Sequence, residues 1–183
     1  MDEFRHETTL KDGTLVLIRL YEPGDSEEIY AGLRRLSDST TYLRFMTCLN
    51  SLPNERLLEL KKIDHDHHLA ICAFDLSKDP MVGMGIARYV RMESDSLIAE
   101  AAVTILDEYQ NKGLGTELLY ILTKLASQKG VTHLRAHVLS TNKPILAIAR
   151  KVGSKISHYE GQVLQVDWPV DEALETFIRA RGS

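Results

Sequence analysis

The sequence has too little of several features that mark specialised protein classes. Only two of its 183 residues are cysteines, Cys48 and Cys72, too few for a disulfide framework or a cysteine-based metal site. No apolar run approaches the ~20 residues that a membrane helix requires. The N-terminal stretch MDEFRHETTL is too polar for a signal peptide. We therefore expect a protein of the reducing cytoplasm, with no membrane association and no metal.

Long basic blocks, internal repeats and low-complexity linkers are also absent. The formal net charge is -4, so the sequence does not indicate nucleic-acid binding. Hydrophobic residues make up 44% and charged residues 26% of the chain, which supplies enough apolar side chain for a folded core. The length suits one domain, and we expect residues 1–183 to form a single domain.

Hydrophobic patterning predicts strands and short helices in the first half of the chain. TLVLIRLYEP predicts a first strand, and HLAICAFDL, MVGMGIARYVRM and LIAEAAVTIL predict three more. The short polar turns between the last three are typical of an antiparallel meander. Helices are expected from Asp25 or Ser26 to about Leu36, over SDSTTYLRFM, and over NERLLELKKI after Pro53.

The period becomes helical after Gly113 and continues to Gly130, which is a typical helix stop. THLRAHVL follows as a strand, so this helix links two strands as in a βαβ crossover. NKPILAIARKVG predicts a short helix, KISHY and QVLQVDW predict strands, and DEALETFIRA predicts a terminal helix. This order predicts an α/β or α+β fold with a mixed sheet. The apolar stripe of the long helix consists of Leu114, Leu118, Ile121, Leu122 and Leu125.

Two glycines stand one residue apart at the strand-to-helix junction YQNKGLG. Helix N-termini carry unpaired, partly positive N–H groups that bind phosphates, and glycine lets a phosphate approach the backbone. A tight turn without a ligand would also explain two glycines. A dinucleotide fingerprint is excluded because Leu118 replaces its third glycine, and a Walker motif because Lys112 precedes both glycines. The residues that fit a pyrophosphate cradle are Gln110, Lys112, Gly113, Gly115 and Thr116.

The pattern Gln-x-x-Gly-x-Gly between a strand and a long helix, with NKPILAIARKVG downstream, resembles the acetyl-CoA-binding core of the GNAT acetyltransferase superfamily. The resemblance covers about residues 15–168, the core of a single N-acetyltransferase domain. STTYLRF and DGTLVLIRL resemble the bacterial protein-lysine acetyltransferase branch, whose domains are often fused to regulatory or acyl-CoA synthetase-like domains. The resemblance implies a mixed, mostly antiparallel sheet flanked by helices in three layers, α-β-α.

The resemblance also implies acetyl-CoA as the cosubstrate and the residues that bind it. The pantetheine arm is expected to pair with the main chain of Thr104, Ile105 and Leu106. Asn142 is expected to contact this arm and to cap its own helix, a common role of asparagine. Backbone groups of the Gly loop would hold the pyrophosphate, from Gln110, Asn111, Lys112, Gly113, Leu114, Gly115 and Thr116.

The implied chemistry moves an acetyl group from a thioester to an amine. A lysine amine has a pKa of about 10.4, so a base is needed to deprotonate it near neutral pH. Glu100 interrupts the uncharged strand LIAEAAVTIL and shares a face with Ala102 and Thr104. Related enzymes carry a glutamate here, so we predict Glu100 as a partly buried general base; a surface glutamate is the alternative. The Thr104 main-chain N–H is the expected oxyanion donor.

Two positions depart from the pattern of the superfamily. Many relatives place a tyrosine, which protonates the leaving thiolate, where this chain has Ala149, and an aromatic residue where it has Ser154. Tyr120 and Tyr159 are the remaining candidates for a general acid. We predict direct acetyl transfer to a lysine on a protein, with an acyl-CoA synthetase as one candidate acceptor. Small-amine acetylation and a catalytically weak acyl-CoA-binding or sensing module remain alternatives, and the sequence indicates no oligomeric state.

Other motifs favour structural roles. DHDHH at residues 64–68 is expected to be a solvated turn, since adjacent side chains cannot easily face one metal ion. His133 and His137 share a strand face and are assigned to packing. Arg44 is expected at the surface, and the Gly83/Gly85 pair is expected to mark a bulge or a close backbone approach.

Overall fold

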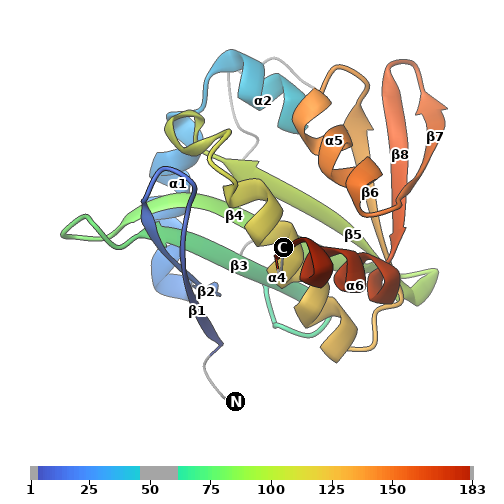
Figure 1. Ribbon diagram of the computed structural model, residues 1–183, viewed down its shortest axis with the longest axis horizontal. Coiled ribbons are helices and arrows are strands. Elements are labelled where there is room, and N and C mark those ends of the chain that lie inside the picture. Colours follow the sequence, from blue (N-terminus) through green and yellow to red (C-terminus); the bar gives the residue numbers. More distant parts are fainter. Residues whose placement is uncertain (1–3, 46–61, 182–183) are drawn as a thin grey trace.

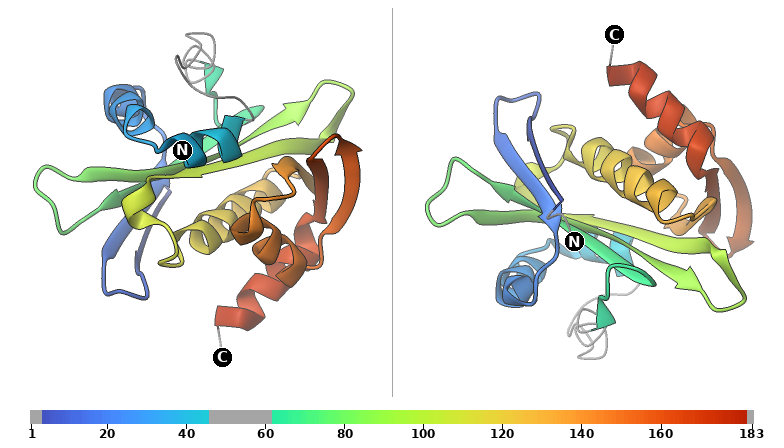
Figure 2. Two further views of the ribbon diagram at one scale, coloured as in Figure 1. Left: turned by 90° about the horizontal axis from the view of Figure 1, so that it is seen from above. Right: turned by 90° about the horizontal axis from the view of Figure 1, so that it is seen from below.

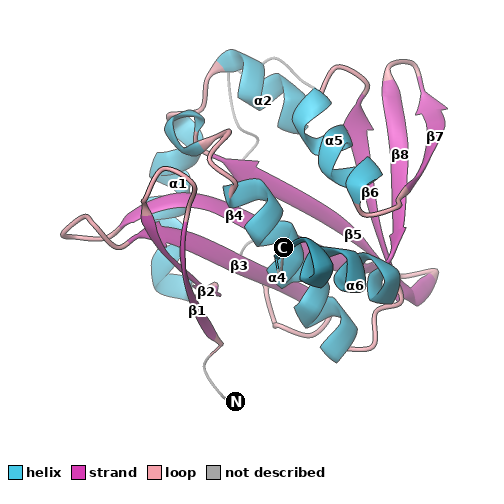
Figure 3. Ribbon diagram, in the orientation of Figure 1, coloured by secondary structure: helices cyan, strands magenta, loops and turns pink. Residues whose placement is uncertain are grey.

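The computed structural model describes residues 4–45 and 62–181, which form one mixed sheet with helices on both faces (Figures 1 and 3). The strands of this part of the chain are β1 (Arg5–Thr9), β2 (Leu15–Leu20), β3 (His68–Asp75), β4 (Val82–Met92), β5 (Asp95–Ile105), β6 (His133–Leu139), β7 (Lys155–Glu160) and β8 (Val163–Pro169). Its helices are α1 (Ser26–Arg34), α2 (Asp38–Phe45), α4 (Leu114–Gln128), α5 (Lys143–Lys151) and α6 (Val170–Arg181), with short 3-10 turns η1 (Pro23–Asp25) and η3 (Asp107–Tyr109).

The elements form three layers. Helices α1 and α2 lie on one face of the sheet, and α4, α5 and α6 lie on the other (Figure 2). The strand order is β1-β2-β3-β4-β5-β6-β8-β7, and the pairs are antiparallel except for β5 with β6. The predicted three-layer fold and meander are therefore confirmed. Most of the predicted helix over NERLLELKKI lies outside the described residues. Among the helices that are described, none is long and apolar enough to cross a membrane.

The core forms where the sheet is covered on both sides. Every residue of β3 is buried, because β3 is an inner strand covered on both faces. Helix α4 packs its predicted leucine and isoleucine stripe into this core, and each member of the stripe is at most 7% exposed. Gly130 ends the helix as predicted, with a left-handed φ of 76° that few other residues adopt easily.

Strands β5 and β6 are parallel neighbours that separate after a short contact. Their pairing runs from Ile98 opposite His133 to Glu100 opposite Arg135. Beyond these residues the strands diverge, as Figure 1 shows. Helix α4 is the crossover between them, and its N-terminus lies near the open end of β5. The fold thus places a helix N-terminus beside a gap in the sheet.

The sequence analysis missed strand β1. Its residues alternate in exposure, but this edge strand carries no hydrophobic alternation that would indicate a strand. It pairs with β2 through a tight hairpin, in which Leu10 N–H donates to Thr14 O (2.9 Å) and Gly13 has a φ of 88°. The dipeptide Asp12-Gly13 is a recognised hairpin signal and would have indicated this turn.

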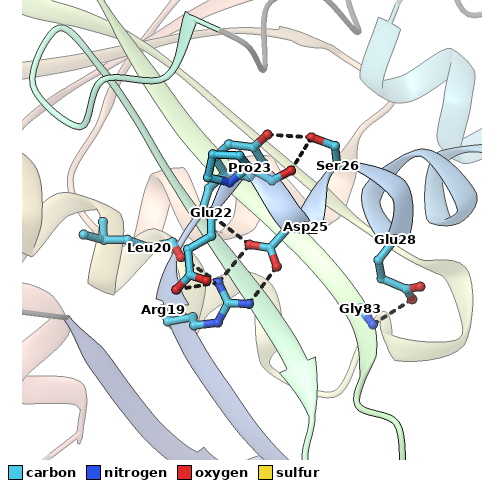
Figure 4. Close-up of polar contacts among 9 residues, drawn as sticks. Arg19, Leu20, Glu22, Pro23, Asp25, Ser26, Glu28 and Gly83 are labelled. Carbon is cyan, nitrogen blue, oxygen red and sulfur yellow. Dashed lines mark hydrogen bonds and ion pairs between the residues drawn. The ribbon is translucent and has the colours of Figure 1, made fainter.

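An ion pair anchors α1 to the sheet (Figure 4). Arg19 at the end of β2 makes two hydrogen bonds to the Asp25 carboxylate, of 2.8 and 2.6 Å, and both side chains are largely buried. Glu28 then accepts the Gly83 N–H from β4 (3.0 Å). Planar, two-point arginine–carboxylate contacts fix orientation strongly. These contacts therefore fix the position of α1 on the sheet. The next helix, α2, borders the gap between β5 and β6.

Gly85 is required by a close backbone approach. A β-carbon at this position would lie 2.7 Å from the Thr104 carbonyl oxygen, and the β3/β4 register shifts nearby. We expect Gly85→Ala to lower the free energy of unfolding by about 2–3 kcal/mol, because the clash is with backbone that cannot rotate away. Gly24→Ala is the control, since its β-carbon would meet no atom within 4 Å. Thermal unfolding of both variants tests this, and equal melting temperatures would contradict it.

Candidate functional site

A cavity of about 560 Å³ occupies the gap between β5 and β6. Gly113, Gly115 and Thr116 at the start of α4 line one part of it, and Glu100 and His137 line another. The cavity therefore joins two groups of residues that are far apart in the sequence. Its volume is in the range of small-molecule and cofactor sites.

The loop before α4 exposes main-chain N–H groups. Gly113 is the N-cap residue, with φ 99° and ψ -8°, and Glu117 N–H makes a helical hydrogen bond back to Gly113 O (3.1 Å). The first-turn amides of residues 114–116 precede this bond and have no helical acceptor. Leu114 is 1% exposed, so its side chain belongs to the core and it can offer only its backbone. The loop therefore presents a row of amides at the position predicted for the pyrophosphate cradle.

Ser37, directly before α2, and Thr40 of α2 hold this loop in place. The Asp107 carboxylate accepts hydrogen bonds from Ser37 N–H (2.9 Å), Ser37 Oγ (2.6 Å) and Thr40 Oγ1 (2.7 Å). Partial burial alone would raise the pKa of Asp107, but these hydrogen bonds hold it below its usual value. The Gln110 side chain donates to Thr40 Oγ1 and to Ile105 O, both at 3.0 Å. Gln110 thus fixes the loop between α2 and β5.

Lys112 faces away from the cavity. Its Nζ lies 3.0 Å from Asp12 Oδ2 in the β1–β2 hairpin and 5.5 Å from the centre of the Tyr109 ring. The hydrogen bond from Lys112, with others from Thr14, lowers the pKa of Asp12 to about 2. Lys112 is not among the residues that line the cavity, whereas Lys11 of the hairpin is. The sequence analysis did not identify Lys11.

The register of β5 determines which main-chain groups face the cavity. In an antiparallel pair, residues that face the partner strand alternate with residues that face away. Leu106 N–H donates to Met84 O of β4 (3.0 Å), so Thr104, two residues earlier and opposite Ile86, also faces β4. Val103 and Ile105 therefore face β6, consistent with the hydrogen bond from Gln110 to Ile105 O. Of the three predicted main-chain contacts, the register supports Ile105 but not Thr104 or Leu106, because it turns the main chain of Val103, rather than that of Thr104, toward the cavity.

Glu100 lines the cavity but is not buried as expected. Its side chain is 60% exposed, because β6 turns away directly after the Glu100–Arg135 pair. His137 Nδ1 lies 3.4 Å from Glu100 Oε1, and the His137 ring packs on Tyr159 with 4.4 Å between ring centres. In the described part of the chain, His137 Nε2 is buried without a hydrogen-bond partner. His137, which the sequence analysis assigned to packing, thus belongs to the cavity wall.

Arg44 and Thr104 form a polar wall beside Glu100. Arg44 is partly buried rather than a surface residue, and its Nε donates to Thr104 Oγ1 (2.9 Å). Both residues line the cavity. The expected surface position of Arg44 is therefore wrong. Its helix, α2, borders the cavity because the Asp107 contacts hold α2 against the loop before α4.

Asn142 begins α5 at the far side of the cavity. Its Oδ1 accepts the Ile145 N–H (3.4 Å), so its predicted capping role is confirmed. The residue also lines the cavity in which the pantetheine arm is predicted to lie. Pro144 occupies the first turn, where the absence of a main-chain N–H has no cost.

The position expected to hold a tyrosine is small and buried. Ala149 is 7% exposed and lines the cavity, as does Ser154, whose Oγ has no partner among the described residues. Tyr120 packs against Phe177 and Arg181, and Tyr159 is 56% exposed beside His137. Neither tyrosine lines the cavity. A side-chain acid for the leaving group is therefore not provided by either candidate.

Residues 64–67 form a bend that leads into β3, whereas His68 is the buried first residue of that strand and not part of a solvated turn. Asp64 Oδ1 accepts the N–H groups of Asp66 and His68, both at 2.9 Å, and these bonds lower the pKa of Asp64. The histidines and acids of the described residues form no cluster that could hold a metal ion. Asp64 thus acts as a turn residue, in line with the expected structural role of DHDHH.

Comparison with known proteins places this geometry in a family. The family model "Acetyltransferase (GNAT) domain" matches residues 15–155. Acetyltransferase Pat of Mycolicibacterium smegmatis is 30% identical over 146 residues, which cover 79% of this chain and 43% of that protein. The chain therefore spans less than half the length of this relative.

Solved structures agree on the fold. The GNAT domain of S. lividans PAT has a TM-score of 0.80 at 20% identity, covering 90% of this chain and 96% of that one. YncA of Salmonella typhimurium, solved with its cofactor acetyl-CoA, has a TM-score of 0.68 at 16% identity, covering 86% and 95%. The chain belongs to the GNAT acetyltransferase family.

Proposed function

We propose that this protein transfers the acetyl group of acetyl-CoA directly to an amine, and that the amine is a lysine side chain of a protein. One observation carries this proposal: a single cavity joins the first-turn amides of α4 to Glu100. A phosphate-containing carrier bound at the α4 amides would extend through the cavity toward the Glu100 carboxylate.

The residues around the cavity fit acetyl-CoA, which supplies the activated thioester when bound. The amides of residues 113–116 and the partial positive charge of the α4 N-terminus suit a pyrophosphate. Gly113 and Gly115 carry no β-carbon that would keep a phosphate from these amides. The main chains of Val103 and Ile105 face the gap and would pair with the pantetheine arm, while Asn142 lies across from them.

Glu100 would act as the general base. A lysine ammonium with a pKa of about 10.4 must lose a proton before it can attack, at a cost of roughly 4.6 kcal/mol at pH 7. Glu100 Oε would take this proton, and the neutral nitrogen would form the new amide bond. The contact with His137 Nδ1 favours one orientation of an otherwise exposed carboxylate. A positioned base of this kind contributes about 100-fold to 10,000-fold in rate.

The carbonyl oxygen of the thioester gains negative charge as the amine attacks. The register of β5 supports the Val103 N–H, rather than that of Thr104, as the donor to this oxygen, because the Thr104 main chain faces β4. The carbon–sulfur bond then breaks and the electron pair leaves on the sulfur. Because a thiol has a pKa near 8.5, its thiolate is a fair leaving group. The second proton, which the nitrogen loses as the amide forms, would pass through water to the thiolate. This agrees with the small side chain of Ala149 in the cavity wall.

The openness of the site around Glu100 supports a macromolecular acceptor. Glu100 is 60% exposed, and Tyr159, which packs on the His137 ring, is 56% exposed. A lysine on the surface of another protein could reach such a carboxylate, whereas small-molecule sites usually enclose their ligand. The buried thiol of Cys72, free in the structure, is compatible with the cytoplasm as the place of reaction.

Release of thiol from acetyl-CoA tests the proposed reaction. We expect acceptor-dependent release with lysine-containing peptides or an acyl-CoA synthetase, above the rate of hydrolysis without acceptor. Turnover with small amines alone would contradict the protein acceptor. Tight binding of acetyl-CoA without any turnover would instead favour an acyl-CoA-binding or sensing module.

A further inference from the structure

The β1–β2 hairpin packs on the loop that begins α4. Lys11 N–H donates to Lys112 O (3.3 Å), and Asp12 Oδ2 lies 3.0 Å from Lys112 Nζ. These contacts join the turn of the hairpin, residues 11–13, to the amides of the proposed pyrophosphate cradle. The hairpin thus forms an outer wall of this cradle, although about 100 residues separate Lys11 from Lys112 in the sequence.

The two lysines at this contact have different electrostatic surroundings. Lys112 is paired with Asp12, whose pKa of about 2 keeps the carboxylate ionised as the pH falls, until the pH nears that value. The charge of Lys112 is therefore compensated, and its side chain lies outside the cavity. For Lys11, the described residues provide no ion pair, and its side chain lines the cavity. The available positive charge belongs to Lys11.

The position of Lys11 brings this charge close to the first-turn amides. Its Cγ and Cε atoms lie 3.9 Å from the point that a β-carbon of Gly113 would occupy. Gly113, Gly115 and Thr116 line the same cavity. A lysine ammonium is a compact charge that binds phosphate oxygens through charge-assisted hydrogen bonds, and its long stem allows it to follow the ligand.

We propose that Lys11 binds the pyrophosphate of CoA, and that the Asp12–Lys112 pair holds the hairpin in the position this requires. This inference rests on the proposed function, because it needs CoA on the amides of residues 113–116. In this proposal the pyrophosphate binds both the amides of residues 113–116 and the Lys11 ammonium, which comes from a different element of the fold. It also separates the roles of two lysines that both lie next to the Gly loop.

Calorimetric titration with CoA and dephospho-CoA tests this assignment in Lys11→Ala. We expect the Kd for CoA to rise about tenfold at low salt, since a charge-assisted hydrogen bond to phosphate is lost. The increase should be the same for dephospho-CoA, which keeps the pyrophosphate but lacks the 3′-phosphate. It should shrink at high salt, where exposed charges are screened. Lys11→Arg should bind within about threefold of the wild type, because it keeps the charge.

Lys129→Ala is the matched control, as it removes the same charge from an exposed position at the far end of α4. Equal affinities of Lys11→Ala and wild type, or equal losses in Lys11→Ala and Lys129→Ala, would overturn the inference. A loss confined to CoA would also overturn it by assigning Lys11 to the 3′-phosphate. If the wild type itself does not bind CoA, the proposed function fails instead. Circular dichroism and melting temperature verify that each variant is folded.

Discussion

Replacing Glu100 with glutamine is expected to lower kcat for acetyl transfer by about 100-fold to 1,000-fold, because the side chain can no longer accept the proton of the lysine. The affinity for acetyl-CoA should stay nearly unchanged, since the amides of α4 are untouched. The rate deficit should become smaller as the pH rises toward the lysine pKa of about 10.4, where the amine loses its proton without help. Steady-state kinetics over a pH series, together with calorimetric binding, measure both effects.

Glu160→Gln is the matched control for this variant. It makes the same chemical change at an exposed position of β7 and outside the cavity. We expect its kcat to equal that of the wild type. A Glu100→Gln protein with normal turnover near neutral pH would show that Glu100 is a surface carboxylate and that the amine is deprotonated in another way.

Gly113→Ala is expected to raise the Kd for acetyl-CoA roughly 10-fold to 100-fold. At φ 99° an alanine is strained, and relief of this strain would turn the amides of residues 113–116 away from the phosphate. A strained position of this kind is worth about 1–3 kcal/mol, which corresponds to the expected range. Binding by calorimetry and KM for acetyl-CoA are the measurements, and kcat at saturating acetyl-CoA should change less than KM.

The other end of the same helix offers a control for backbone strain. Gly130 also has a positive φ, of 76°, and a β-carbon would have no neighbour within 4 Å at Gly130 and none nearer than 3.9 Å at Gly113. We expect Gly130→Ala to lower stability without changing the affinity for acetyl-CoA. If both variants lost affinity to the same degree, the effect would come from destabilised α4 rather than from the amides at Gly113.

Local patterns were sufficient for most of the fold. The leucine stripe of α4 and its Gly130 stop identify the helix, because both signals arise within one element. The short polar turns between β3, β4 and β5 identify an antiparallel meander. Strand β1 was missed because an edge strand with one polar face and few apolar residues resembles a loop, apart from its Asp12-Gly13 turn.

The details of the site depend on contacts between distant segments. Whether the main chain of Thr104 faces the cavity is decided by its pairing with Ile86, which no pattern in β5 alone reveals. The exposure of Glu100 follows from the divergence of β6. Lys112, predicted to face the phosphate, is instead paired with Asp12, which belongs to a hairpin near the N-terminus of the chain. Periodicity locates such residues on strands and helices but does not determine their partners.

The most direct measurement of the central claim is a titration of the isotopically labelled protein with CoA, followed by amide NMR. We expect the amide signals of residues 113–116 to shift in a saturable way, with smaller shifts for Val103 and Ile105. The signals of residues 113–116 should not move when CoA is replaced by pantetheine, which lacks the pyrophosphate. If the signals of residues 113–116 stay in place at saturating CoA, the start of α4 does not bind the cosubstrate and the account is wrong.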